Sequence, residues 1–323
     1  MKSDIFPAVT TESESLSSPS AQPALLEELA IVPKEEGQLE LGITREKEND
    51  RNYHLGGRSF YFFDFDDNVV FLTTPLVLFH KNTGDELKIS SGDFAQEHSR
   101  IGESGPYRDY EIRWDDSTGT FRCFRDHHQA ELEKLGLKKQ IFIHDVAHAL
   151  GFPDFHWKGP SWDCFFHATF NQRPISVITA RGHNPKTIMD GVDLFVEAKK
   201  LPCRPNYLSV FPVSHIPTRH HLGDKDLTMK TPALKQAAIR ASVEHAIKVY
   251  GYSPHHRFGM SDDDPKNIEF IAAEMKTLKK AYPEMGFFLI ETQKGQFIKH
   301  EISLNETRSQ NLSPESTEQI SFL

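Results

Sequence analysis

Acidic side chains end an otherwise apolar segment near residue 60. The segment SFYFFDF (59–65) predicts a buried strand, and Asp64, Asp66 and Asp67 follow at its end. A buried carboxylate without a partner is costly, so acids at this position indicate a cation or a reaction that balances them. Carboxylates at positions i and i+2 of a strand end face one pocket. Asp64 and Asp66 therefore predict a site where one carboxylate attacks while the other moves a proton.

Three further polar groups lie at the ends or starts of elements later in the chain. They are Thr179 near the end of PISVITA (174–180) with Arg181 just after it, Lys235 at the start of a helical segment, and Asp262 and Asp263 after HRFGMS (256–261). A hydroxyl and cations can hold phosphate oxygens, and carboxylates can bind a hard divalent cation. Together with a free carboxylate nucleophile, these groups form a complete set of parts for phosphoryl transfer.

The elements that must position these residues alternate between strands and helices. The strand-like segments are 59–65, 174–180, 207–213 and 287–292, with 256–261 weaker, and the helical ones are 160–171, 231–251 and 264–283. Segments that are apolar at every position indicate strands covered on both faces. The alternation predicts an α/β fold with a doubly wound, Rossmann-like parallel sheet. Ligands bind such sheets at the carboxyl ends of the strands, where Asp64 and Asp66 fall.

Two stretches do not follow this alternation. TPLVLFHKNTGDELKISS (74–91) predicts a hairpin that turns at residues 82–85. Residues 92–159 form an insertion rich in His, Arg and aromatic residues, and their pattern predicts no particular fold.

The composition is that of a soluble globular protein. With 323 residues, 38% apolar, the chain can bury one substantial core. Residues 1–54 predict a disordered acidic arm, 55–300 the folded domain and 301–323 a flexible tail. The net charge of −9 comes from the two ends, so the domain has no basic excess that would indicate nucleic-acid binding. Three scattered cysteines and the lack of a signal peptide or membrane span favour a cytoplasmic location.

The order of the motifs resembles that of the haloacid dehalogenase (HAD) superfamily of Mg²⁺-dependent phosphohydrolases. The pattern hhhhDxDxx, then hhhT, then Lys, then Asp-Asp after another strand covers residues 60–295, where h is an apolar residue. In this comparison the hairpin 74–91 resembles the flap of the family, and the insertion 92–159 takes the place of a cap. The resemblance implies a phosphomonoester hydrolase. A cap of this size favours a small phosphorylated molecule as substrate, but the sequence leaves a sugar phosphate, a nucleotide, a phosphoprotein and a nucleic-acid end open as alternatives.

The resemblance implies a role for each catalytic candidate. Asp64 would be the nucleophile that forms an aspartyl-phosphate, and Asp66 would be the general acid and then the base for water. Thr179, Arg181 and Lys235 would bind the phosphoryl group. An acid at Asp66 favours phosphatase chemistry over dehalogenation, which needs no such group.

The resemblance also implies a Mg²⁺ site. Its ligands would be Asp64, Asp262 and Asp263, together with Asp66 through the neighbouring backbone carbonyl.

Some positions depart from the family pattern or leave alternatives open. Asn68 stands where the family usually has Thr, and Asp67 stands where it usually has Gly. Lys225 and Lys230 compete with Lys235 for the same role. The change at Asn68 keeps a second hypothesis open, in which the chain is a catalytically weak HAD-like module that binds a phosphorylated ligand or a protein partner.

A third hypothesis is a zinc hydrolase. HDVAHALGFPD (144–154) places His144 and His148 at positions i and i+4, with Asp154 as a third candidate ligand. The catalytic Glu of such helices is replaced by Asp145, which is one methylene shorter. The insertion is also too short to hold a protease domain, so we favour a piece of the cap here.

Overall fold

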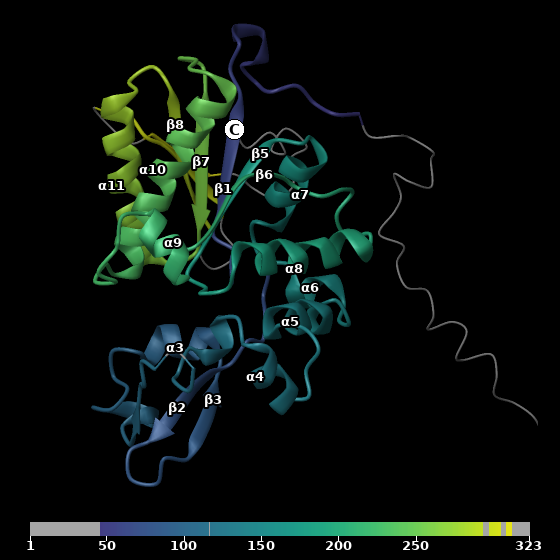
Figure 1. Cartoon of the computed structure of the whole chain (residues 1–323). Coiled ribbons are helices and arrows are strands. Elements are labelled where there is room, and N and C mark those ends of the chain that lie inside the picture. Colours follow the sequence, from purple (N-terminus) through teal and green to yellow (C-terminus); the bar gives the residue numbers. More distant parts are fainter. Residues whose placement is uncertain (1–45, 116, 293–296, 305–307, 312–323) are drawn as a thin grey trace, which may run out of the picture. The chain divides into compact units, whose positions relative to one another are not determined.

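The computed structural model describes residues 46–115, 117–292, 297–304 and 308–311 (Figure 1). All elements below lie in the compact unit formed by residues 47–323. Most of the predicted N-terminal arm is outside the described residues. Its last residues join the domain, because Asp50 is buried, pairs with Arg173 at 2.8 Å and accepts a hydrogen bond from the Ser59 amide.

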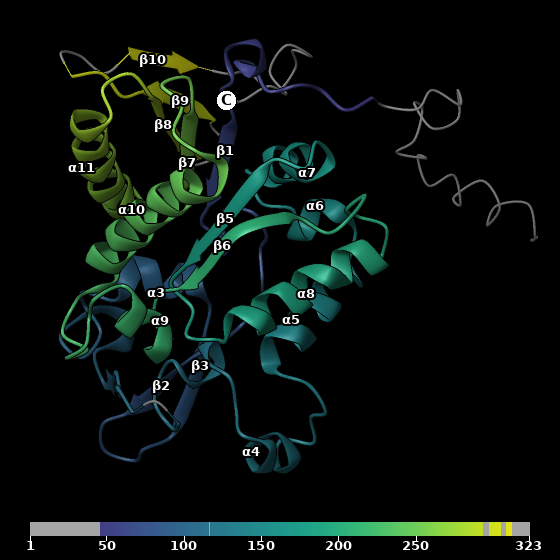
Figure 2. The ribbon, with the colours of Figure 1, turned by 45° about the horizontal axis from the view of Figure 1, so that its top comes forward.

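A seven-stranded sheet of order β10-β9-β8-β7-β1-β5-β6 forms the centre of the domain (Figures 1 and 2). The parallel strands are β1 (Ser59–Phe63), β5 (Pro174–Thr179), β6 (Asn206–Pro212), β7 (Arg257–Asp262) and β8 (Gly286–Glu291), and the antiparallel ones are β9 (Ile298–Glu301) and β10 (Arg308–Asn311). Since β1 lies between β5 and β7, the carboxyl ends of these three strands meet at one edge.

Helices cover both faces of this sheet, as a doubly wound fold requires. The helices are α5 (Ile141–Ala149), α7 (Trp162–Phe170) and α8 (Pro185–Glu197) on one face, and α10 (Thr231–Tyr250) and α11 (Pro265–Ala281) on the other (Figure 2). Along β1, Tyr61 and Phe63 pack into the hydrophobic core on the side of α7 and α8, whereas Phe60 and Phe62 pack into the core on the side of α10 and α11. The prediction of an α/β fold with a parallel sheet is confirmed.

The ends of the chain differ from their prediction. The sequence predicts a flexible tail from residue 301, whereas Arg308–Asn311 pairs with β9 as β10. Residues 312–323 lie outside the described part of the chain. Helix α8 was not predicted, and the weakest predicted strand, 256–261, is β7, a central strand beside β1.

The predicted hairpin is present. β2 (Leu76–His80) and β3 (Glu86–Ile89) pair antiparallel, and β4 (Tyr110–Glu111) adds to β2. The rest of the insertion is mainly short helices. They are α3 (Ser91–Glu97), α4 (Gln129–Lys134), α5 and α6 (Asp154–Trp157), with single turns at Gly105–Tyr107 and Arg122–Phe124.

Two more short helical elements complete the described domain: the turn Tyr53–Leu55, and α9 (Ile216–His221) after β6. Among the described residues, no helix has the length and apolar character to cross a membrane.

Candidate active site

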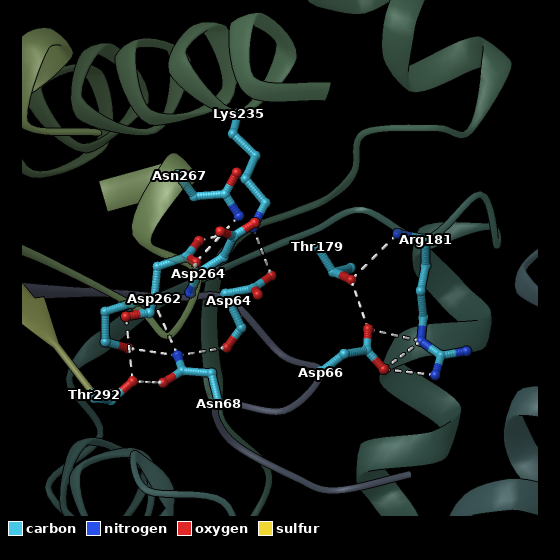
Figure 3. A network of polar contacts seen from close by, with 11 residues as sticks. Asp64, Asp66, Asn68, Thr179, Arg181, Lys235, Asp262, Asp264, Asn267 and Thr292 are labelled. Atoms are coloured by element: carbon cyan, nitrogen blue, oxygen red, sulfur yellow. Dashed lines mark hydrogen bonds and ion pairs between the residues drawn. The ribbon is translucent and has the colours of Figure 1, made fainter. Parts of the chain in front are cut away.

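Two carboxylates come together at the adjoining ends of β1 and β7 (Figure 3). The Asp64 amide donates to the Ser261 carbonyl at 3.0 Å, which extends the pairing of the two strands by one residue. Asp262 is the last residue of β7, and Asp263 follows it. The backbone amide of Asp264 and the Asn267 side chain donate to Asp262 Oδ1 at 3.0 and 3.1 Å. The strand ends and the start of α11 therefore hold Asp262 in place.

Lys235 bridges the two carboxylates from the first turns of α10. Its Nζ lies 2.8 Å from Asp262 Oδ2 and 3.1 Å from Asp64 Oδ1, and the residue is 2% exposed. Lys225 and Lys230 are exposed. Of the three candidate lysines, the structure thus places Lys235 at the site.

Three carboxylates share this one ammonium group. Ligand oxygens of Asp64, Asp262 and Asp263 lie within 4.8 Å of one another, the one group of three or more candidate metal ligands in the described chain. Burial raises the pKa of Asp64 well above its ordinary value, although Lys235 opposes the shift. Burial also acts against the charge of Lys235, but Asp262 and Asp64 outweigh it and raise the Lys235 pKa. Three carboxylates beside one ammonium group carry excess negative charge when they are ionised, which suits a divalent cation with oxygen ligands.

The titration of Asp263 should be visible in the stability of the metal-free protein. Burial raises the pKa of Asp263 to about 7, and Asp262 adds to the increase. Because the folded pKa exceeds the unfolded value of about 4, this carboxyl makes the free energy of unfolding fall as pH rises from about 4 to 7. We would measure unfolding by urea in the presence of EDTA. As pH rises from about 5 to 8, the free energy of unfolding of Asp263→Asn should increase relative to that of the wild type by about 2.5 kcal/mol. Parallel pH profiles for the two proteins would contradict the shift.

Asn68 ties the strand ends together from below the carboxylates (Figure 3). Its amide nitrogen donates to the Asp64 carbonyl at 3.0 Å, and to the carbonyl and hydroxyl of Ser261 at 3.1 and 2.9 Å. Its Oδ1 accepts from Ser161 at 2.8 Å and Thr292 at 2.9 Å. The residue is fully buried. Asn68 therefore fulfils a structural role at this position, with every polar atom of its side chain bonded.

Replacing Asn68 should destabilise the protein strongly. Asn68→Ala leaves buried hydroxyl and carbonyl groups without partners, so we expect a loss of about 3 kcal/mol in the free energy of unfolding by urea. Asn82→Ala, at an exposed position of the hairpin turn, is the matched control and should change it by less than about 0.5 kcal/mol. Equal effects of the two substitutions would show that the Asn68 contacts carry no net stability.

Asp67, the other departure from the family pattern, also fits its place. Its φ of 57° is in the left-handed region, which glycine adopts freely and aspartate tolerates. Its Oδ2 accepts from Ser91 at 2.9 Å, so the turn after β1 is attached to the start of α3.

Asp66 belongs to a second cluster beside the first (Figure 3). The Thr179 hydroxyl donates to Asp66 Oδ2 at 3.0 Å. Arg181 Nε lies 2.9 Å from both Asp66 oxygens, and Nη2 lies 2.6 Å from Oδ1. Thr179 and Arg181 thus both contact the second aspartate directly. The Asp66 side chain is not part of the group of three carboxylates, so its contribution to a metal site, through the neighbouring carbonyl, stays a prediction.

The zinc-like motif does not assemble a site. His144 and His148 are exposed on α5, and Asp154 pairs with Lys158 and Lys200. Asp145 accepts a hydrogen bond from Thr74. Within the described residues these side chains form no metal-ligand group.

Several residues of the site were not predicted from the sequence. Thr292 directly follows the apolar strand β8, as Asp64 follows β1, so a polar residue at the end of an apolar strand could have indicated it. Ser161 and Ser261 gave no local signal, because their partner Asn68 is 93 or more positions away.

Comparisons of the chain with protein-family models, curated proteins and solved structures gave no match.

Proposed function

We propose that this chain is a Mg²⁺-dependent phosphomonoester hydrolase of the HAD type that forms an aspartyl-phosphate on Asp64. The observation that carries the proposal is the group of buried Asp64, Asp262 and Lys235, with half-buried Asp263 beside them, at adjoining strand ends. A structural cluster of this kind would need a second cation to balance its charge, whereas a metal and a phosphoryl group balance it in a catalytic site.

The residues present fit a magnesium ion. Asp64, Asp262 and Asp263 would hold it, and oxygen ligands of this type suit Mg²⁺. When bound, the ion supplies positive charge that stabilises the charge developing on the transferring group.

In the first half of the reaction, an Asp64 oxygen attacks phosphorus and the bond from phosphorus to the leaving oxygen breaks. The electron pair stays with the leaving oxygen, which takes a proton from Asp66. Lys235 lies 3.1 Å from Asp64 Oδ1, and its positive charge would offset the negative charge of the phosphoryl group that approaches this carboxylate. The Thr179 hydroxyl donates its one proton to Asp66 Oδ2, and it would have to leave that bond to donate to an oxygen of the phosphoryl group.

In the second half, the Asp66 carboxylate accepts a proton from water. The water oxygen attacks phosphorus, and the bond between phosphorus and Asp64 breaks. The products are inorganic phosphate and free Asp64, and Asp66 is protonated again for the next cycle.

The hairpin β2–β3 and the insertion would serve as flap and cap. They are joined to the site, because Ser91 contacts Asp67 and Thr74 contacts Arg181. A cap over the site favours a small phosphorylated molecule as substrate.

The test is phosphate release from an aryl phosphate and from a panel of small phosphate esters, with Mg²⁺ and with EDTA. We expect hydrolysis that EDTA stops and added Mg²⁺ restores. No release from any ester would contradict the proposal. Thermal stabilisation by Mg²⁺ without hydrolysis would instead favour the catalytically weak binding module.

A further inference from the structure

Arg181 contacts Asp66 and the insertion at the same time. Toward Asp66, its guanidinium group makes the three short contacts described above, which fix the carboxylate at both oxygens (Figure 3). A planar guanidinium that binds a carboxylate through two nitrogens sets its orientation, which a lysine ammonium cannot do.

The other side of the same guanidinium group is held by the hairpin segment and the insertion. Nη2 donates to Thr74 Oγ1 at 2.9 Å, and the Thr74 hydroxyl donates to Asp145 of α5. The rings of Phe124 and Phe142 each lie with their centroid 4.8 Å from Arg181 Cζ. Thr74, Phe124 and Phe142 therefore contact the Arg181 side chain, and Asp145 is linked to it through Thr74.

Arg181 is poorly placed for direct contact with a substrate. The residue is 1% exposed, and two of its three nitrogens are already bonded to Asp66 and Thr74. The third nitrogen, Nη1, has no hydrogen-bond partner among the described residues but is buried, so in this structure the guanidinium group acts on a substrate through a neighbour. Asp66, at 24% side-chain exposure, is the neighbour that reaches the open part of the site.

We propose that Arg181 is a positioning residue that orients Asp66 for proton transfer and makes that orientation depend on the insertion, through Thr74 and Asp145. The proposal rests on the proposed function, since it gives Arg181 a role in the reaction of that site. It replaces the expected role of Arg181 as a phosphate ligand. A movement of α5 would change the position of Asp145, and the Thr74 hydroxyl and the Arg181 guanidinium group would pass this change on to Asp66.

The leaving group of the substrate tests this role. An aryl oxygen departs readily without a proton, whereas an alkyl oxygen needs one, so a misplaced Asp66 should slow alkyl esters most. We expect Arg181→Lys to lower kcat/KM, which reports formation of the aspartyl-phosphate, at least tenfold more for an alkyl phosphate than for an aryl phosphate, the pattern expected of Asp66→Asn. Once Asp66→Asn is present, adding Arg181→Lys should slow the alkyl ester no further.

Substitutions at Thr74 provide a second test if Arg181→Lys folds poorly. Thr74→Val keeps the shape of this buried side chain and removes the hydroxyl that joins Arg181 to Asp145. It should shift the alkyl-to-aryl ratio in the same direction by about three- to tenfold, and Thr74→Ser should restore the wild-type ratio.

The outcomes separate this inference from the proposed function. Equal losses on both esters in Arg181→Lys and Thr74→Val, with wild-type protein active, would show a structural role alone and overturn the inference. A wild-type protein that hydrolyses no ester would overturn the proposed function and this inference with it.

Discussion

Asp64→Asn should abolish Mg²⁺-dependent phosphate release, by roughly 10⁴-fold or more, without destabilising the protein. An amide cannot attack phosphorus, so no aspartyl-phosphate can form. The same substitution removes one of three neighbouring carboxylates that repel one another, while Lys235 keeps its 2.8 Å contact with Asp262. Phosphate release and urea unfolding of the same preparations measure the two effects.

The control for this experiment is Asp226→Asn, an exposed aspartate in the loop before α10. It should leave both turnover and the free energy of unfolding at wild-type values. Residual Mg²⁺-dependent turnover above about 10% in Asp64→Asn would mean that another group is the nucleophile.

Lys235→Met should have the largest effect on stability. The substitution leaves the buried carboxylates of Asp64 and Asp262 without their cation, and breaking a buried pair in this way costs about 3–5 kcal/mol. Turnover should also fall, because positive charge beside the nucleophile is lost. Mg²⁺ should recover part of the lost stability, since a divalent cation takes over the balance of charge.

Lys230→Met is the matched control, because Lys230 precedes the same helix and is exposed. It should change the free energy of unfolding by less than about 0.5 kcal/mol. A Lys235→Met protein as stable as this control would show that the lysine does not stabilise the acidic cluster, and it would remove the main argument for a charged site.

The central sheet could be predicted from the sequence because its strands are apolar on both faces. All five positions of β1 are buried, and a segment of that kind fits few other places in a fold. Helix α8 was missed although Asn184 and Pro185 mark its start. Gly191 interrupts its pattern, and a Cβ there would lie 2.3 Å from the Phe142 ring, so the glycine serves packing between helices.

The sequence predicts those residues of the candidate site that lie at the end of a strand or the start of a helix. Asp64, Thr179 and Asp262 carry that local signal, and parallel strands bring their ends together. The contacts between Arg181 and the insertion could not be predicted in this way. They depend on how residues 74 and 124–145 pack against β5, and no periodic pattern in the sequence encodes that packing.

The most direct test of the account is to trap the phosphorylated enzyme. Asp66→Asn, mixed with an aryl phosphate and Mg²⁺ and quenched in acid, should accumulate the intermediate, because the leaving group needs no proton but the attacking water has lost its base. Peptide mass spectrometry should then find one phosphoryl group on Asp64. Hydrolysis by the wild type with no phosphoryl group on Asp64 in the trapped variant would contradict the proposed mechanism.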